Sequence, residues 1–142
     1  MTECREQKLL FQDHGSRTVE AAFDGGMMTS DGGALLLREL DLKQRIVTDF
    51  ARCFTDHRDS GAVEFSLDQL LKQRIFGLAL GYEDLNDHDK LRVDPLLALL
   101  CGRADVMGQD RRCASDRGKP LAGKSTLNRL ELWSGDPKRD GI

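Results

Sequence analysis

The sequence predicts a mainly α-helical fold, in which short helices pack as a small domain with one N-terminal strand or hairpin. Apolar residues recur at helical spacing through most of the chain up to Leu100, and candidate helix-capping residues precede three of these runs. Near the N-terminus, one segment partly alternates between apolar and polar residues, as a strand does. We expect a disordered polar connector and a C-terminal tail to follow the helices.

The N-terminal part is expected to begin with a flexible segment, residues 1–17, followed by a strand over residues 18–24 that ends at two glycines. Ser30 is a candidate cap for a helix whose apolar face contains Leu35 and Leu40. A second helix is predicted over about residues 42–54, because Leu42, Ile46, Phe50 and Phe54 recur every four positions.

The strongest helix signal begins at Ser66, which forms a capping box with Gln69 and precedes a run of apolar residues that ends before Gly81. A polar helix is predicted over residues 82–92. Asp94 as the cap and Pro95 at the first helical position then predict a third helix, ending before Gly102.

These elements divide the chain into a helical region over residues 18–102, a basic connector over 103–123, a short helix over 124–133 and a divergent tail over 134–142. The connector is predicted to be mobile because it is polar and rich in charge.

Composition favours a soluble, cytoplasmic protein of one domain. The chain has 142 residues, a net charge of −3, no apolar run of membrane-spanning length and no apolar N-terminal leader. Its four cysteines, which form no C-x-x-C pair, are expected to be reduced. Residues 1–102 hold 12 basic and 18 acidic side chains, whereas residues 103–142 hold 9 and 6. This asymmetry permits a phosphate-binding face, although a solvated basic loop explains it equally well.

Residues 118–125, GKPLAGKS, have the spelling of a nucleotide-binding P-loop. Such a loop requires a buried strand before it, and the polar residues upstream do not predict one. Pro120 also removes one of the N–H donors that would hold phosphate. We therefore favour a turn that leads into a helix, with Lys124 facing solvent or a polyanion.

Two histidines allow a metal-site hypothesis. His57, followed by His88-Asp89, resembles the ligand order of HD-type metal phosphohydrolases, in which imidazole and carboxylate ligands activate water. The alternative is that both histidines are structural and that the acidic residues near them lie on a solvated helix face.

Four strings occur together in order: FDGGMMTSDGGALLLRELD (23–41), CFTDHRD (53–59), QLLKQRIFGLALGYEDLNDHDKLRVDP (69–95) and LAGKSTLNRLEL (121–132). They resemble the N-terminal region of the DDE transposases of bacterial insertion sequences, group 1 of the transposase DDE domain. In that family the GKST residues belong to a string leading into a helix, and YEDLNDHD is also a family string.

The resemblance implies a protein that binds the terminal inverted repeats of its element, with DNA as its partner, and it allows a homodimer. Full-length relatives use three carboxylates and two Mg²⁺ ions on an RNase H-like core. Because the expected strand motif is absent and the pattern departs after Leu132, we expect a truncated, DNA-binding module with no catalytic residue, metal or cofactor of its own. The alternatives are the HD-like phosphohydrolase, or a fragment that folds poorly and exposes Val19 and Phe23.

Contacts to DNA phosphates are expected from the basic residues of the connector and of the following helix. These are Arg111, Arg112, Arg117, Lys119, Lys124 and Arg129. The helix that starts near residue 125 is the better candidate for a DNA groove, since the 82–92 segment is acidic.

Overall fold

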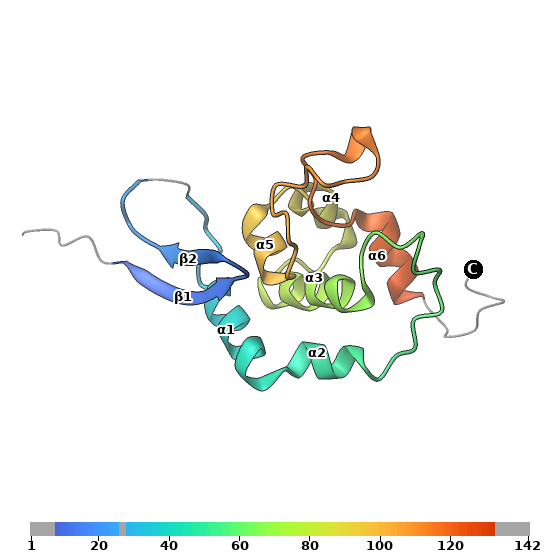
Figure 1. Ribbon diagram of the computed structural model, residues 1–142, viewed down its shortest axis with the longest axis horizontal. Coiled ribbons are helices and arrows are strands. Elements are labelled where there is room, and N and C mark those ends of the chain that lie inside the picture. The colour runs from blue at the N-terminus through green and yellow to red at the C-terminus, as the bar shows by residue number, and fades with distance from the viewer. Residues whose placement is uncertain (1–7, 26–27, 133–142) are drawn as a thin grey trace, which may run out of the picture.

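A computed structural model describes residues 8–25 and 28–132. An antiparallel hairpin lies at one end of the molecule, and short helices surround the central helix α3 (Figure 1). The elements are β1 (Leu9–His14), β2 (Arg17–Ala21), α1 (Ala34–Gln44), α2 (Ile46–Ala51), α3 (Leu67–Ala79), η1 (Leu85–Asp87), α4 (His88–Leu91), α5 (Pro95–Leu100), η2 (Ala114–Asp116) and α6 (Lys124–Glu131). The mainly helical fold with an N-terminal hairpin is therefore confirmed.

The hairpin corrects the prediction of a flexible segment over residues 1–17, because β1 occupies part of it; residues 1–7 lie outside the described part. Leu9 pairs with Ala21 and Phe11 with Val19, and the turn contains Gly15 at φ 61°. Val19 is buried against the helical core, whereas Phe23 is exposed. The strand predicted over residues 18–24 is the second half of this hairpin.

The helix predicted over residues 42–54 is wrong in its start, because α1 continues to Gln44 and a break separates it from α2. The break falls at Arg45, which adopts the left-handed conformation at φ 56°. Its own N–H donates to the Asp41 carbonyl, and the buried Asp41 carboxylate accepts from the N–H of Val47 at 2.8 Å. The predicted cap of α1 is also wrong, since Gly33 rather than Ser30 is the N-cap.

The two helices with the clearest capping signals are confirmed. Ser66 and Gln69 form both hydrogen bonds of the capping box at the start of α3. Asp94 accepts from the N–H groups of Leu96 and Leu97 at the start of α5. The main core, between the hairpin, α1, α2, α3 and α5, contains Phe76, Leu97 and Leu121.

The polar helix predicted over residues 82–92 is shorter than expected, consisting of η1 and the single turn α4. Asp84 caps η1 by accepting from the N–H of Asn86. His88 is fully buried, which brings this polar segment onto α3.

Residues 103–123 are not a disordered connector. Arg103 and Arg111 are 7% and 6% exposed, and Pro120, Leu121 and Ala122 are buried. The segment is ordered because side chains bind its own backbone: the Asp105 carboxylate accepts from the N–H groups of Met107 and Asp110, both at 3.0 Å.

Within residues 8–25 and 28–132, no helix has the length and apolar character needed to span a bilayer.

Candidate nucleic-acid interface

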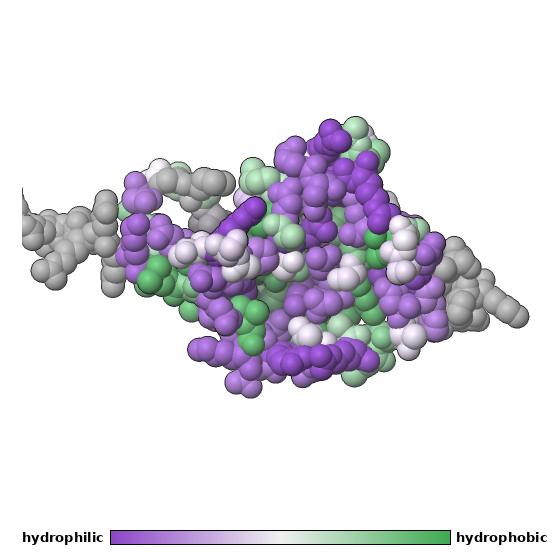
Figure 2. Space-filling view, in the orientation of Figure 1, coloured by the Kyte–Doolittle hydropathy of each residue, from purple (hydrophilic) through white to green (hydrophobic). Residues whose placement is uncertain are grey.

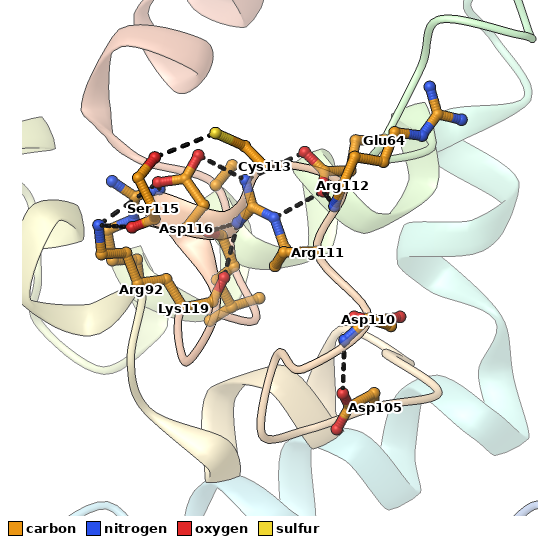
Figure 3. A network of polar contacts seen from close by, with 12 residues as sticks. Glu64, Arg92, Asp105, Asp110, Arg111, Arg112, Cys113, Ser115, Asp116 and Lys119 are labelled. Carbon is orange, nitrogen blue, oxygen red and sulfur yellow. Dashed lines mark hydrogen bonds and ion pairs between the residues drawn. The ribbon is translucent and has the colours of Figure 1, made fainter.

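Arg111 holds the 103–123 segment to the loop before α3 (Figure 3). Its Nε and Nη2 donate to the two carboxylate oxygens of Glu64 at 2.7 and 3.0 Å. Its Nη1 donates to the carbonyls of Lys119 and Leu121, and the guanidinium lies 4.7 Å from the centre of the Phe65 ring. These contacts occupy its donors, so the sequence-predicted phosphate ligand Arg111 has a structural role here.

Arg112 reinforces the same attachment. Its N–H donates to Glu64 at 3.0 Å, and its guanidinium donates to the carbonyls of Gly61 and Val63 at 2.8 and 3.3 Å. Burial alone would raise the pKa of the Glu64 carboxyl, but hydrogen bonds from Arg111 and Arg112 hold that pKa below its usual value. Glu64 is therefore the anionic centre on which two arginines converge.

Asp116 is a second anionic centre, at the C-terminal end of η2. Arg92, Arg111 and Lys119 lie within 3.2 to 3.4 Å of its carboxylate. The Lys119 ammonium also donates to the Ser115 carbonyl at 2.8 Å. Burial would raise the pKa of Asp116, but these cations lower it. Two of the basic residues predicted to bind DNA, Arg111 and Lys119, thus converge on one aspartate.

Arg117 and Arg129 differ from the other basic residues predicted from the sequence. Both are exposed, and among the described residues neither side chain has a hydrogen bond or an ion pair. Lys124 is intermediate: its ammonium lies 3.1 Å from Asn86 Oδ1 and 3.4 Å from the Asp89 carboxylate, but 49% of the side chain is exposed. An exposed pair of this kind is weak and can exchange for another anion.

Helix α6 presents Lys124 and Arg129, and it is fixed from three sides. Leu127 is fully buried in a small core with Phe65 and Leu70. At the start of the helix, the Asp89 carboxylate accepts from the N–H of Lys124 at 3.1 Å. Towards its end, Glu131 pairs with Arg74 of α3.

A cavity of about 530 Å³ lies beside this helix, between the loop that precedes α3 and α6 itself. Its floor is apolar, formed in part by Leu67, Leu70 and Leu130. The side chains of Arg58, Asp116 and Arg129 also line this cavity. Arg117, which follows Asp116 in the sequence, therefore lies close to the same cavity as Arg129. The face seen in Figure 2 is mostly hydrophilic, with smaller groups of apolar side chains between the polar ones.

The GKPLAGKS residues do not form a phosphate-binding loop. Pro120 is buried, and both backbone groups of Ala122 bind the Gln73 side chain. The N–H of Lys124, which would face a phosphate, already faces the Asp89 carboxylate. A Cβ at Gly123 would lie 3.2 Å from atoms of both Arg92 and Asp89, so this glycine permits these two side chains to pack closely against the backbone before α6.

The HD-like metal hypothesis is not supported by the positions of its three residues. His88 is buried beside Gln73 and against Gly77, Asp89 caps α6, and His57 is exposed on the loop after α2. Across residues 8–25 and 28–132, no group of three or more His, Cys, Asp or Glu side chains could hold a metal ion.

Comparison with known families identifies the class of protein. The model of the family described as transposase DDE domain group 1 matches residues 11–139. The chain therefore belongs to this family, and the match includes most of the hairpin, the helices and the basic segment. It continues to residue 139, so the expectation that the family pattern ends at Leu132 is wrong. Searches of the curated proteins and of the solved structures found no match.

Magnesium is the metal that this family implies, and the described residues do not fit a two-metal site. The described residues contain no group of three or more His, Cys, Asp or Glu side chains that could hold a metal ion, and four of their carboxylates have other partners: Glu64 and Asp116 bind arginines, Asp105 binds backbone N–H groups and Asp89 caps α6. No chemical step is therefore assigned to them.

Sequence reasoning missed Gln73 and Asp89, the two residues that fix the start of α6. Gln73 follows Leu70 by three positions, on the same helical face, and a polar residue on an apolar face was the signal that could have indicated it. Asp89 carries no such signal, because its partner lies 35 residues away.

Proposed function

We propose that the described part of this chain is a DNA-binding region of a DDE transposase, which acts in the cytoplasm on the terminal inverted repeats of its element. The observation that carries the proposal is the family match over residues 11–139. Arg117 and Arg129, which are exposed and have no partner within residues 8–25 and 28–132, support it. Phosphate contacts supply most of the sequence-independent affinity of proteins for DNA.

The cations that we assign to phosphates are Arg117, Arg129 and Lys124. The two arginines have no partner among the described residues to give up, so binding a phosphate costs them mainly solvation and side-chain order. Lys124 exchanges one exposed partner for another. These three side chains form the phosphate-contact set.

Lys119, Arg111 and Arg112 contribute indirectly. Their charged groups bind carbonyl and carboxylate oxygens within the 103–123 segment and the loop before α3. We propose that they hold the segment in the shape that presents Arg117. Replacing one of them is expected to alter folding before it alters a DNA contact.

Affinity for DNA as a function of salt tests the proposal. The 142-residue protein is titrated against a fluorescent duplex containing the element's terminal repeat and against an unrelated duplex, at several salt concentrations. Arg117→Ala and Arg129→Ala are each expected to weaken binding to both duplexes and to reduce the salt slope by about one.

Lys43→Ala is the matched control, because Lys43 is an exposed cation on α1 with no ion pair among the described residues. It is expected to leave the slope unchanged. If the wild type binds neither duplex, the proposed function is wrong. If all three variants behave alike, the assigned contacts are wrong.

Self-association is a separate part of the proposal. Four large apolar side chains of α1, α2 and the residues after α2 remain 44% to 66% exposed: Leu36, Ile46, Phe50 and Phe54. We propose that these side chains form the contact of a homodimer. Sedimentation equilibrium tests it: Ile46→Glu is expected to convert a dimer into a monomer, and a monomeric wild type would contradict it.

A further inference from the structure

The outward face of α6 combines residues that suit the edge of a DNA base rather than its phosphate. Ser125, Asn128 and Leu132 are exposed, and among the described residues the side chains of Ser125 and Asn128 have no hydrogen-bond partner. At about 100° per residue, Ser125, Asn128, Arg129 and Leu132 fall within roughly 100° of the helix circumference. This sector lies opposite the buried Leu127.

The size of α6 fits the major groove. The diameter of an α-helix with its side chains, about 10–12 Å, matches the major-groove width of about 12 Å, and the eight residues of α6 supply about two turns to lie in it. The attachments through Leu127, Asp89 and Arg74 hold the helix against α3 and leave its outer sector free. A base-reading side chain requires this rigid presentation, because its hydrogen bonds depend on direction.

We infer that Asn128 reads an adenine in the major groove, while the neighbouring Arg129 binds the backbone phosphate. This inference rests on the proposed function and deepens it. An asparagine amide can donate to N7 and accept from N6 of adenine, a pairing that no other base presents in that groove. Ser125, one turn earlier, can bond to an adjacent base edge.

Electrostatics define the side from which the duplex approaches. At the start of α6, the Asp89 carboxylate accepts from the N–H of Lys124 and pairs with its ammonium, so a phosphate there meets a cation that is already partly neutralised. Arg129 lies on the opposite flank, where it borders the cavity next to the loop before α3. The duplex therefore lies over the outer sector of α6 towards Arg129, with Asn128 facing the bases.

Selection from a duplex library with a randomised central segment tests the inference. The wild type is expected to enrich a motif that contains an adenine. Asn128→Ala is expected to lose the preference for this adenine by about tenfold or more, with the salt slope unchanged. Asn128→Asp is expected to lose the same preference and also to weaken binding to every duplex, because it adds a negative charge beside Arg129. Asn128→Gln, which keeps the amide, is expected to retain part of the preference.

Arg129→Ala is expected to show the reverse behaviour, with the adenine preference kept and the salt slope reduced. Gln44→Ala, which removes an exposed amide from α1, is the matched control. Thermal melting of each variant shows that the folded state persists, so loss of preference reports on contact rather than on stability.

The outcomes separate the two proposals. A wild type that binds DNA but enriches no motif, or an Asn128→Ala variant that enriches the same adenine, would overturn the base-reading inference and leave the DNA-binding proposal standing. A wild type that binds no duplex would overturn both.

Discussion

The side chain of Gln73 and the backbone of Ala122 form a closed pair of hydrogen bonds across 49 residues of sequence. The Gln73 Nε2 donates to the Ala122 carbonyl at 2.8 Å, and its Oε1 accepts from the Ala122 N–H at 3.1 Å. Gln73 is 1% exposed. Since Ala122 comes two residues before α6, this pair fixes the start of that helix against α3.

Replacing Gln73 by leucine should destabilise the protein. The substitution leaves a buried N–H and a buried carbonyl without partners, which costs about 1–3 kcal/mol for each group. We expect the free energy of unfolding, measured by urea denaturation, to fall by about 2–4 kcal/mol. Gln44→Leu at the exposed end of α1 is the control, and an equal loss there would contradict the assigned role.

Gly108 should not tolerate a side chain. Its φ is +68°, and a Cβ built on it would lie 2.5 Å from the Pro120 nitrogen. Gly118, at φ +82°, has nothing within 4 Å of the same position. Gly118→Ala should therefore cost about 1 kcal/mol from backbone strain. Gly108→Ala should cost about 2–4 kcal/mol because the chain must also move apart. Equal midpoints of thermal melting would be inconsistent with this packing.

Arg111→Ala should reduce stability more than Arg112→Ala. Arg111 is buried, and its loss leaves the Glu64 carboxylate without its two-point partner, a change that costs about 3 kcal/mol for a partly exposed pair. Arg112 is exposed, and its two carbonyl partners can bind water instead. Urea denaturation measures both. A double variant, Arg111→Met with Glu64→Gln, should recover part of the loss, because it leaves no unpaired charge.

His88 should make the folded state less stable as the medium becomes mildly acidic. The pKa of the His88 imidazole is lowered, mainly by burial and then by the charge of Arg74. The negative charges of Asp87, Glu131 and Asp89 raise this pKa, but they do not outweigh the lowering. Gln73 directs its amide N–H towards the Nδ1 atom of His88 at 3.3 Å. Nδ1 therefore accepts, and the neutral ring carries its proton on Nε2. A second proton, on Nδ1, would face the Gln73 N–H donor.

The unfolded chain therefore takes up a proton near the ordinary histidine pKa of about 6.5, whereas the folded chain does not. The stability contributed by neutral His88 is fully present above that pH and decreases as the pH falls below it. Urea midpoints at pH 7.5 and 5.5 should differ less in His88→Gln than in the wild type. An equal difference would show that other groups cause the effect.

The parts of the fold that local chemistry determines were predictable. Ser66 with Gln69, and Asp94 with Pro95, carry their capping geometry within four residues, and both helices begin where the sequence places them. The break at Arg45 was not predictable. The side chain of Asp41 stabilises it by accepting from the N–H of Val47, and this contact does not interrupt the apolar repeat from Leu42 to Phe50 that predicted one continuous helix.

The 103–123 segment shows why charge alone misleads. Its composition is that of a mobile basic loop, but Arg103 pairs with Asp110, and Arg111 and Arg112 reach the loop before α3. Partners 47 to 51 residues away in sequence leave no local signal. Counting cations predicted a basic surface, whereas the structure commits several of them to internal contacts and, in the part of the chain that it describes, leaves Arg117 and Arg129 without a partner.

The unequal engagement of these arginines has a consequence for digestion by trypsin, which cleaves after basic residues. The enzyme must pull an extended stretch of chain into its active site, and it can do so only where local unfolding is easy. Cleavage after Arg111 requires the segment to detach from Glu64, Phe65 and two carbonyls, whereas Arg117 projects from the end of a short turn. Within residues 103–123, cleavage is therefore expected after Arg117 before it occurs after Arg111, and the two fragments remain associated until the Glu64 contacts separate.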